Sequence, residues 1–196
     1  MEPIILASSS PRRQEILQKL GIPFVVHPAN ISETVPRDIA VPDGPEFLAA
    51  RKVDAVIRSL PPDHQIPWVL GADTAIYASR RLYGKPKDRA EAVRFLRELQ
   101  GKKHDVVTAV ALFNGQLLYL DTRSVRTKVT FAPMSDAEIE WYVNTGEWHE
   151  AAGAYRIQGM GSCFIKKIEG SESAVMGLPI FELYDMLKTQ GYPFLA

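Results

Sequence analysis

The sequence predicts an α/β fold with a mixed β-sheet, and two observations support this prediction. Apolar runs typical of strands alternate with helical patterns along the 196 residues, so some strands are joined through helices and can pair in parallel. Two further apolar runs are joined by Asn114-Gly115, a dipeptide typical of hairpins, so these two strands are expected to be antiparallel. A sheet with both kinds of connection is mixed.

The first half of the chain begins with a strand and a helix. Residues 4–6 are apolar and form the predicted strand, and Pro11 opens a helix for which Ser10 is placed as the N-cap. Gly21 follows this helix, as is usual at a helix end. The patterns then predict a short strand over residues 24–27, a loop over residues 28–45, a helix over residues 45–59 and a buried strand over residues 68–77.

The second half contains two helix starts with capping-box spacing. Asp88 with Glu91, and Ser135 with Glu138, have the three-residue separation that lets each side chain bond the other's backbone N–H. The helix that begins after Asp88 is expected to end at Gly101. The other predicted elements are strands over residues 106–113 and from residue 116 onward, a glycine-punctuated strand-and-loop segment over residues 153–177 and an amphipathic helix from Pro179.

Composition argues against several classes of partner. The chain has 23 basic and 23 acidic residues, so it is not expected to bind nucleic acid or an anionic membrane. No apolar stretch approaches the length of a membrane span, and no signal-peptide pattern opens the sequence. Cys163 is the single cysteine, so an internal disulfide is excluded and a reducing, cytoplasmic setting is expected.

Residues 8–13 have the composition of an anion-binding site. They comprise three serines, a proline suited to the first helical position, and the adjacent Arg12 and Arg13. The backbone N–H groups at the start of a helix attract anions, and guanidinium groups match phosphate oxygens two at a time. Taken alone, these residues fit an ordinary strand-to-helix turn with solvated arginines equally well.

Asp73 is a carboxylate within a strand of small and apolar residues. Burial of an unpaired carboxylate is costly, so this one must be paired, hydrogen-bonded or bound to a metal, and such groups are candidates for acid–base chemistry. The alternative is a structural aspartate bonded to backbone amides. The next residue, Thr74, points to the opposite face of a regular strand but can line the same pocket at a strand end.

Four other polar residues have both a functional and a structural interpretation. Lys52 lies in the apolar stripe of its predicted helix, where a lysine either binds a ligand or extends its ammonium to solvent. Lys85 is either a phosphate contact or an exposed loop lysine, and Gln158 either recognises a nucleobase edge or is a structural amide. Glu33 is either a metal ligand or a solvated glutamate, and a hard cation such as Mg²⁺ or Mn²⁺ would suit carboxylates.

Together these segments resemble the Maf family of nucleoside triphosphate pyrophosphatases. The resemblance covers nearly the whole chain and rests on six segments, residues 6–13, 31–33, 71–74, 84–86, 152–159 and 177–179. It implies a fold like that of inosine-triphosphate pyrophosphatases, in which residues 1–196 form a single domain with an elongated mixed sheet in two lobes and a nucleotide cleft between them. It also implies hydrolysis of a nucleoside triphosphate to the monophosphate and pyrophosphate.

The resemblance also implies roles for single residues. Asp73 matches the general base of the family, and Glu33 and Asp73 are the expected contacts of a divalent metal cation, Mg²⁺ or Mn²⁺. The positions that hold the triphosphate are Ser8, Arg13, Lys52 and Lys85. The positions typical of the subgroup that acts on dTTP and UTP are Arg12, Thr74 and Gln158. The 7-methyl-GTP subgroup has a tryptophan in place of the first arginine and a glutamate after the aspartate.

The chain departs from the family pattern close to one of these segments. Ala151 stands where the family usually has a lysine, and Arg156 stands where a glycine is common.

Two alternatives to dTTP/UTP hydrolysis stay open, a nucleotide-binding regulator of cell division with little turnover and a 7-methyl-GTP pyrophosphatase. Also open are whether the pyrimidine substrate is canonical or modified and whether the protein is a homodimer.

Overall fold

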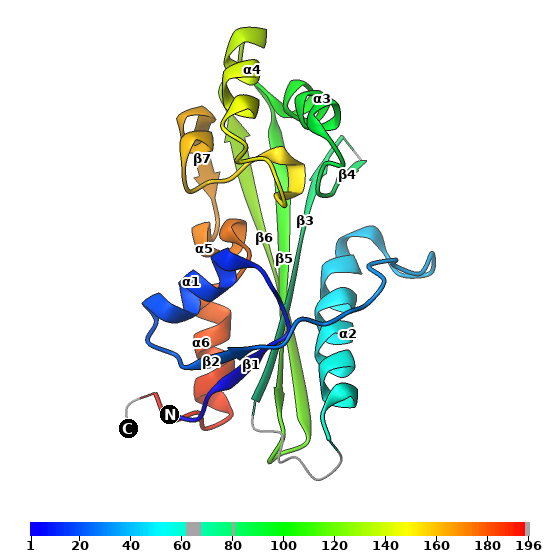
Figure 1. Cartoon of the computed structure of the whole chain (residues 1–196), viewed down its shortest axis with the longest axis vertical. Coiled ribbons are helices and arrows are strands. Elements are labelled where there is room, and N and C mark those ends of the chain that lie inside the picture. The colour runs from blue at the N-terminus through cyan, green and yellow to red at the C-terminus, as the bar shows by residue number, and fades with distance from the viewer. Residues whose placement is uncertain (62–67, 80, 195–196) are drawn as a thin grey trace. The chain divides into compact units, whose positions relative to one another are not determined.

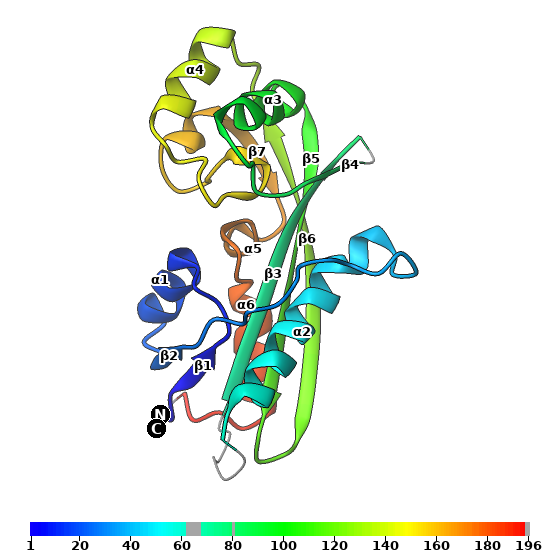
Figure 2. The ribbon, with the colours of Figure 1, turned by 45° about the vertical axis from the view of Figure 1, so that its right-hand side comes forward.

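The computed structural model describes residues 1–61, 68–79 and 81–194, shown from two directions in Figures 1 and 2. The chain divides into two compact units. Unit 1 comprises Met1–Asp73, Thr108–Val125 and Gly177–Ala196, and unit 2 comprises Thr74–Val107 and Arg126–Met176. The strands β3 (Trp68–Ala78), β5 (Lys103–Asn114) and β6 (Tyr119–Phe131) contribute residues to both units.

The sheet is mixed, as the sequence predicts. Over the described residues its strand order is β2-β1-β3-β5-β6-β7, with β4 paired to β3. In unit 1, β1 (Ile4–Leu6) lies between β2 (Phe24–Val26) and β3 and is parallel to both. The helical elements of unit 1 are α1 (Pro11–Lys19), the 3₁₀ turn η1 (Val41–Asp43), α2 (Gly44–Ser59) and α6 (Ile180–Thr189).

Helices cover both faces of the sheet in unit 1. Helix α2 packs on one face, where its Val53 belongs to the same core cluster as Ile5 and Val69. Ile4 and Leu6 alternate with Ile5 along β1 and are also buried, so they point to the other face. Figure 1 shows α1 and α6 on that side. Burial on both faces explains why β1 is apolar at every position.

Unit 2 surrounds a separate core. Strand β4 (Arg81–Tyr83) is antiparallel to β3, and β7 (Ile165–Glu169) is antiparallel to β6. The helical elements are α3 (Arg89–Leu99), α4 (Asp136–Asn144), η2 (Ala152–Ala154), η3 (Met160–Phe164) and α5 (Glu172–Met176). Phe95 and Leu96 of α3, Tyr142 of α4, and Val129 and Phe131 of β6 meet in its core cluster.

The helices begin at the predicted positions, but not every predicted capping hydrogen bond forms. Ser135 and Glu138 form a complete capping box at α4. At α3 only half of the predicted box forms, because Glu91 accepts from the backbone N–H of Lys87 and not from that of Asp88. Ser10 occupies the N-cap position of α1 but its side chain makes no capping bond.

Two connections differ from the predictions. The β5–β6 hairpin turns through residues 115–118, so the second strand begins at Tyr119 and not near residue 116. The Asn114 side chain accepts bonds from the backbone N–H groups of Gln116 and Leu117, which favours this longer turn. Within the segment predicted as strand and loop, Ser171 accepts from the N–H of Ala174 and thereby caps the short helix α5.

A helix that crosses a bilayer needs about 20 consecutive, mainly apolar residues. Over residues 1–61, 68–79 and 81–194, no helix combines the length and apolar character that crossing a bilayer requires.

His104 of β5 is a histidine buried in the core of unit 2. Its Nε2 lies 2.8 Å from the Tyr155 hydroxyl oxygen, and the Phe131 ring meets it edge-on. Burial lowers the pKa of His104 from 6.5 to about 4. The imidazole is therefore mostly neutral in the folded protein above about pH 4.

We expect His104 to reduce stability in mild acid. Between pH 6.5 and about 4 the imidazole is protonated in the unfolded chain but not in the folded one, so the free energy of unfolding falls as the pH drops through this window. The loss reaches about 3 kcal/mol below the folded pKa. Urea unfolding of the wild type and of His104→Gln at neutral pH and in acid measures it. The same pH dependence in both proteins would contradict the prediction.

Candidate functional site

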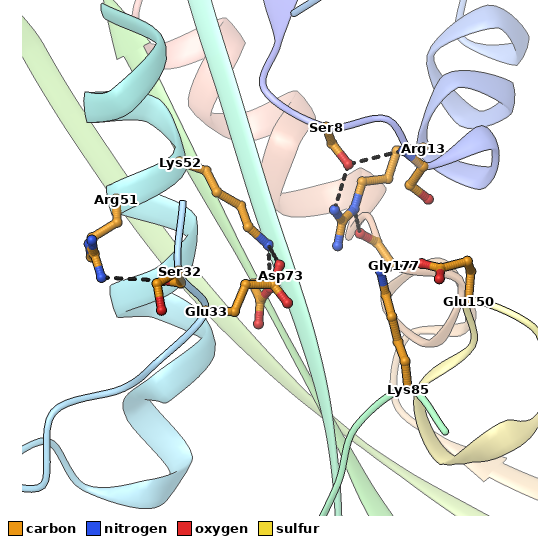
Figure 3. Close-up of polar contacts among 11 residues, drawn as sticks. Ser8, Arg13, Ser32, Glu33, Arg51, Lys52, Asp73, Lys85, Glu150 and Gly177 are labelled. Carbon is orange, nitrogen blue, oxygen red and sulfur yellow. Dashed lines mark hydrogen bonds and ion pairs between the residues drawn. The ribbon is translucent and has the colours of Figure 1, made fainter. Parts of the chain in front are cut away.

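Ser8 and Arg13 are buried together where β1 leads into α1. The Arg13 guanidinium donates from Nη1 to Ser8 Oγ and from Nε to the carbonyl oxygen of Gly177, both at 2.8 Å (Figure 3). Ser8 Oγ also accepts from the backbone N–H of Ser10 at 3.3 Å. These bonds fix the guanidinium at the start of the first helix, where the sequence predicts an anion site.

Asp73, Lys52 and Glu33 form a second cluster in unit 1. The ammonium of Lys52 lies 2.6 Å from Asp73 Oδ1 and 2.8 Å from Glu33 Oε1 (Figure 3). The side chains of Lys52 and Asp73 are 9% and 12% exposed, whereas that of Glu33 is 55% exposed. Lys52 is therefore a buried cation shared by one buried and one accessible carboxylate, and its ammonium does not extend to solvent.

The close approach of α2 to β3 accounts for this pairing. A Cβ on Gly71 would lie 2.4 Å from the carbonyl oxygen of Ala49 and 2.8 Å from a methyl carbon of Val53, so only glycine fits between the two backbones. Lys52 is three residues after Ala49 on the helix, and Asp73 is two residues after Gly71 on the strand. The contact at Gly71 thus brings the ammonium within reach of the carboxylate.

The electrostatics of unit 1 link its two clusters. Burial is the main cause that raises the pKa of Asp73 above its usual value, and the charges of Lys52 and Arg13 oppose it. Burial likewise lowers the pKa of Arg13, while Asp73 and Glu33 favour its charged form. Asp73 therefore lies within the field of both cations, and deprotonation of Asp73 is coupled to them.

We expect Gly71→Ala to disturb this cluster and to lower stability. The added methyl group must push α2 away from β3, and overpacking of this kind typically costs about 1 to 3 kcal/mol. Chemical denaturation of the variant measures the cost. Gly84→Ala is the matched control, because a Cβ on Gly84 meets no atom within 4 Å. Equal stability of the two variants would contradict the role given to the close approach.

The predicted residues of unit 2 lie on β3 and on two loops. Thr74, directly after Asp73 on β3, is half-buried, and Gln158 is exposed. Lys85 is exposed too, and its ammonium pairs with Glu150 Oε2 at 2.5 Å (Figure 3). The N–H of Gly153 donates to the carbonyl oxygen of Gly84 at 3.0 Å. This bond joins two of the segments on which the family resemblance rests, residues 84–86 and 152–159.

Comparison with known proteins identifies the family. The family model described as Maf-like protein matches residues 3–190. The chain belongs to the Maf family. A relative from Pelotomaculum thermopropionicum is 42% identical over 195 residues, which cover 100% of each chain. Another from Symbiobacterium thermophilum is 44% identical over 196 residues, 100% of this chain and 98% of its own. Both relatives carry the name dTTP/UTP pyrophosphatase.

A solved structure, that of the Ham1 protein of Staphylococcus aureus, has a lower similarity to this Maf chain. It is 13% identical, covers 67% of this chain and 72% of its own, and has a TM-score of 0.46. The strands, helices and strand pairings of this chain themselves make its fold α/β.

The described part of this Maf protein contains no group of three or more histidine, cysteine, aspartate or glutamate side chains arranged to hold a metal ion. It does contain two carboxylates, Glu33 and Asp73, that converge on one positive charge. Mg²⁺ is commonly bound by one or two carboxylates together with substrate phosphates and water. The donor set therefore fits a cation that arrives with a triphosphate.

Two partners of the candidate residues were not predicted from the sequence. The carbonyl of Gly177 holds Arg13 across a separation of 164 residues, and no local pattern predicts such a contact. Glu150, the partner of Lys85, is next to Ala151 in the segment that departs from the family pattern. Its φ of 54° is uncommon for a residue other than glycine, so its backbone is held in a constrained turn.

Proposed function

We propose that this protein hydrolyses dTTP and UTP to the nucleoside monophosphate and pyrophosphate. One observation carries the proposal: the buried Asp73 carboxylate is paired with Lys52 and lies within the field of Arg13. A buried base that is paired with one cation and influenced by the charge of a second suits attack on a polyanion. The names of the full-length relatives supply the reaction and the substrates.

Asp73 acts as the general base in this proposal. A water molecule attacks the α-phosphorus, and the carboxylate accepts its proton as the new P–O bond forms. The bond from the α-phosphorus to the bridging oxygen breaks, and its electron pair leaves with pyrophosphate. The raised pKa of Asp73 makes it a stronger base than an exposed aspartate, and Lys52 keeps it ionised.

The basic residues hold the triphosphate and its developing charge. Arg13 and Lys52 supply fixed positive charge in unit 1, and Ser8 orients the guanidinium of Arg13. Lys85 of unit 2 pairs with Glu150, and the family resemblance assigns it to the triphosphate as well. Such groups stabilise pyrophosphate as it leaves. A divalent cation, Mg²⁺ or Mn²⁺, would be held by Glu33 and Asp73 and would neutralise phosphate charge when bound.

Arg12, Thr74 and Gln158 are proposed to set the preference for pyrimidine nucleotides. We expect Arg12→Ala to reduce the ratio of kcat/KM for UTP to that for ATP by about tenfold, since a lost hydrogen bond to a charged donor is worth roughly 1.5 to 3 kcal/mol. Steady-state kinetics with both nucleotides measure the ratio. An unchanged ranking of substrates would remove Arg12 from this role.

The decisive experiment measures pyrophosphate release from a panel of nucleoside triphosphates with Mg²⁺, with Mn²⁺ and with a chelator. Fastest release from dTTP and UTP supports the proposal, and faster release from a nucleotide with another base refutes the specificity.

Hydrolysis in ¹⁸O-labelled water tests the position of attack, because attack at the α-phosphorus places the label in the monophosphate. Tight binding without release would favour a nucleotide-binding regulator, and preference for 7-methyl-GTP would favour the other subgroup.

A further inference from the structure

The loop that carries Gln158 is closed on itself. We define the Gln158 loop as residues 156–161. At its ends, a Cβ on Gly161 would lie 2.3 Å from the carbonyl oxygen of Arg156, so the two ends are in backbone contact. Ser162 adds bonds from its N–H and its hydroxyl to the carbonyl oxygen of Gly159, at 3.1 and 2.6 Å. Gln158 lies near the centre of this closed loop and is exposed.

Glu147 anchors the loop from outside. Its carboxylate accepts from the backbone N–H of Met160 at 2.9 Å through Oε1 and from that of Gly161 at 3.3 Å through Oε2. Gly159 has a φ of 136°, and a Cβ there would lie 2.4 Å from Glu147 Oε1. The carboxylate can reach these N–H groups because residue 159 has no side chain.

Tyr142 of α4 contacts the other end of the loop. Its hydroxyl accepts from the backbone N–H of Arg156 at 3.1 Å. Tyr142 is fully buried, so this hydroxyl is held by the core of unit 2. Tyr142 therefore accepts a hydrogen bond from the backbone N–H of Arg156, before Gln158. Glu147 accepts from those of Met160 and Gly161, after it.

A fixed loop matters because a glutamine amide can be matched to either pyrimidine. Uracil and thymine present an acceptor O4 and a donor N3–H, whereas cytosine presents a donor amino group and an acceptor N3. The glutamine side chain has one acceptor and one donor group, and turning the amide over exchanges them. The amide can turn over without any movement of the loop, so the part played by the loop is to set where the amide meets the base edge. A displaced loop weakens the pairing that this position favours.

We propose that Glu147 is a positioning residue that sets nucleobase specificity by fixing the Gln158 loop. The proposal deepens the proposed function and rests on its assignment of Gln158 to the base. Glu147 acts on the preference between uracil and cytosine nucleotides and leaves the phosphate chemistry of Asp73 and Lys52 unchanged. A purely structural glutamate would, on removal, lower activity toward every nucleotide alike.

The test compares kcat/KM for UTP and CTP in the full-length wild type, Glu147→Gln, Gln158→Ala and the double variant. We expect Glu147→Gln to lower the UTP/CTP ratio by about tenfold, with amide hydrogen exchange at Met160 and Gly161 becoming faster. In the Gln158→Ala background the same change should leave the ratio unaltered, because Glu147 acts through Gln158. Glu140→Gln is the matched control, since Glu140 is an exposed carboxylate of α4 paired with Arg89.

The outcomes separate this inference from the proposed function. If Gln158→Ala lowers the ratio and Glu147→Gln does not, the inference is overturned and the pyrimidine assignment stands. If Gln158→Ala has no effect on the ratio, both the assignment of Gln158 and the inference fail. Gly159→Ala provides a second route should Glu147→Gln not fold, because its methyl group displaces the carboxylate, and we expect the same fall in ratio. An unchanged ratio in Gly159→Ala would count against the inference.

Discussion

Replacing Asp73 with asparagine is expected to lower kcat for pyrophosphate release from dTTP by about 10²- to 10⁴-fold, the usual contribution of a general base. The amide is nearly isosteric and its oxygen can still accept from Lys52, so the fold is expected to persist. The acidic limb of the pH–rate profile should also disappear. We expect the wild-type rate to rise with pH as Asp73 loses its proton, whereas asparagine has no proton to lose.

The control for this prediction is Asp54→Asn. Asp54 is on the same helix as Lys52, but its side chain is exposed. Within the described residues it forms an ion pair with Arg58. We expect that variant to retain wild-type kcat, and circular dichroism shows whether both variants are folded. A folded Asp73→Asn protein with kcat close to wild type would mean that another group accepts the proton.

Replacing Lys52 with methionine is expected to lower the free energy of unfolding by about 3 to 5 kcal/mol at neutral pH. Methionine keeps most of the side-chain volume but leaves the buried Asp73 without its cation, and breaking a buried pair has a cost of this size. Activity should fall as well, because the proposed base loses its paired cation. Urea unfolding and pyrophosphate release measure the two effects.

The loss in Lys52→Met should depend on pH in a defined direction. Lys52 lowers the pKa of Asp73, so its removal lets burial raise that pKa further. A raised pKa means that the folded state binds the proton over a range in which the unfolded state does not, so stability falls as the pH rises through that range. The destabilisation should therefore be smaller at about pH 5 than at about pH 8.

A double variant tests the cause. Adding Asp73→Asn to Lys52→Met removes the buried charge, and we expect it to restore much of the lost stability and to abolish the added pH dependence. If the double variant is as unstable as Lys52→Met at every pH, the loss comes from packing of the lysine stem and not from an unpaired carboxylate.

Local signals in the sequence predicted most of the elements. Ser135 and Glu138 mark the start of α4 correctly because a capping box involves only neighbouring residues. The signal fails at Ser10 for a physical reason: the hydroxyl that contacts this turn belongs to Ser8, which accepts from the Ser10 N–H and holds Arg13. The hairpin after Asn114 is longer than predicted because the Asn114 side chain bonds two N–H groups of the turn.

The candidate site was predictable as a set of residue types but not as a set of contacts. Asp73 and Lys52 were recognisable because charged residues stand at apolar positions of a strand and a helix. Their mutual bond depends on Gly71, whose role appears only when α2 is packed on β3. Lys85 pairs with Glu150, and Glu147 anchors the Gln158 loop. Each contact joins two different segments of the chain, so no local sequence pattern predicts it.

The unequal exposure of the two lysines makes them respond differently to ionic strength. The side chains of Lys85 and Glu150 are 55% and 76% exposed, so dissolved ions can surround this ion pair. These ions screen the attraction between the two charges, and the Debye length is about 8 Å at physiological salt. Lys52 and Asp73 are shielded from those ions. We therefore expect the Lys85–Glu150 pair to weaken as the salt concentration rises, and the Lys52–Asp73 pair to change much less.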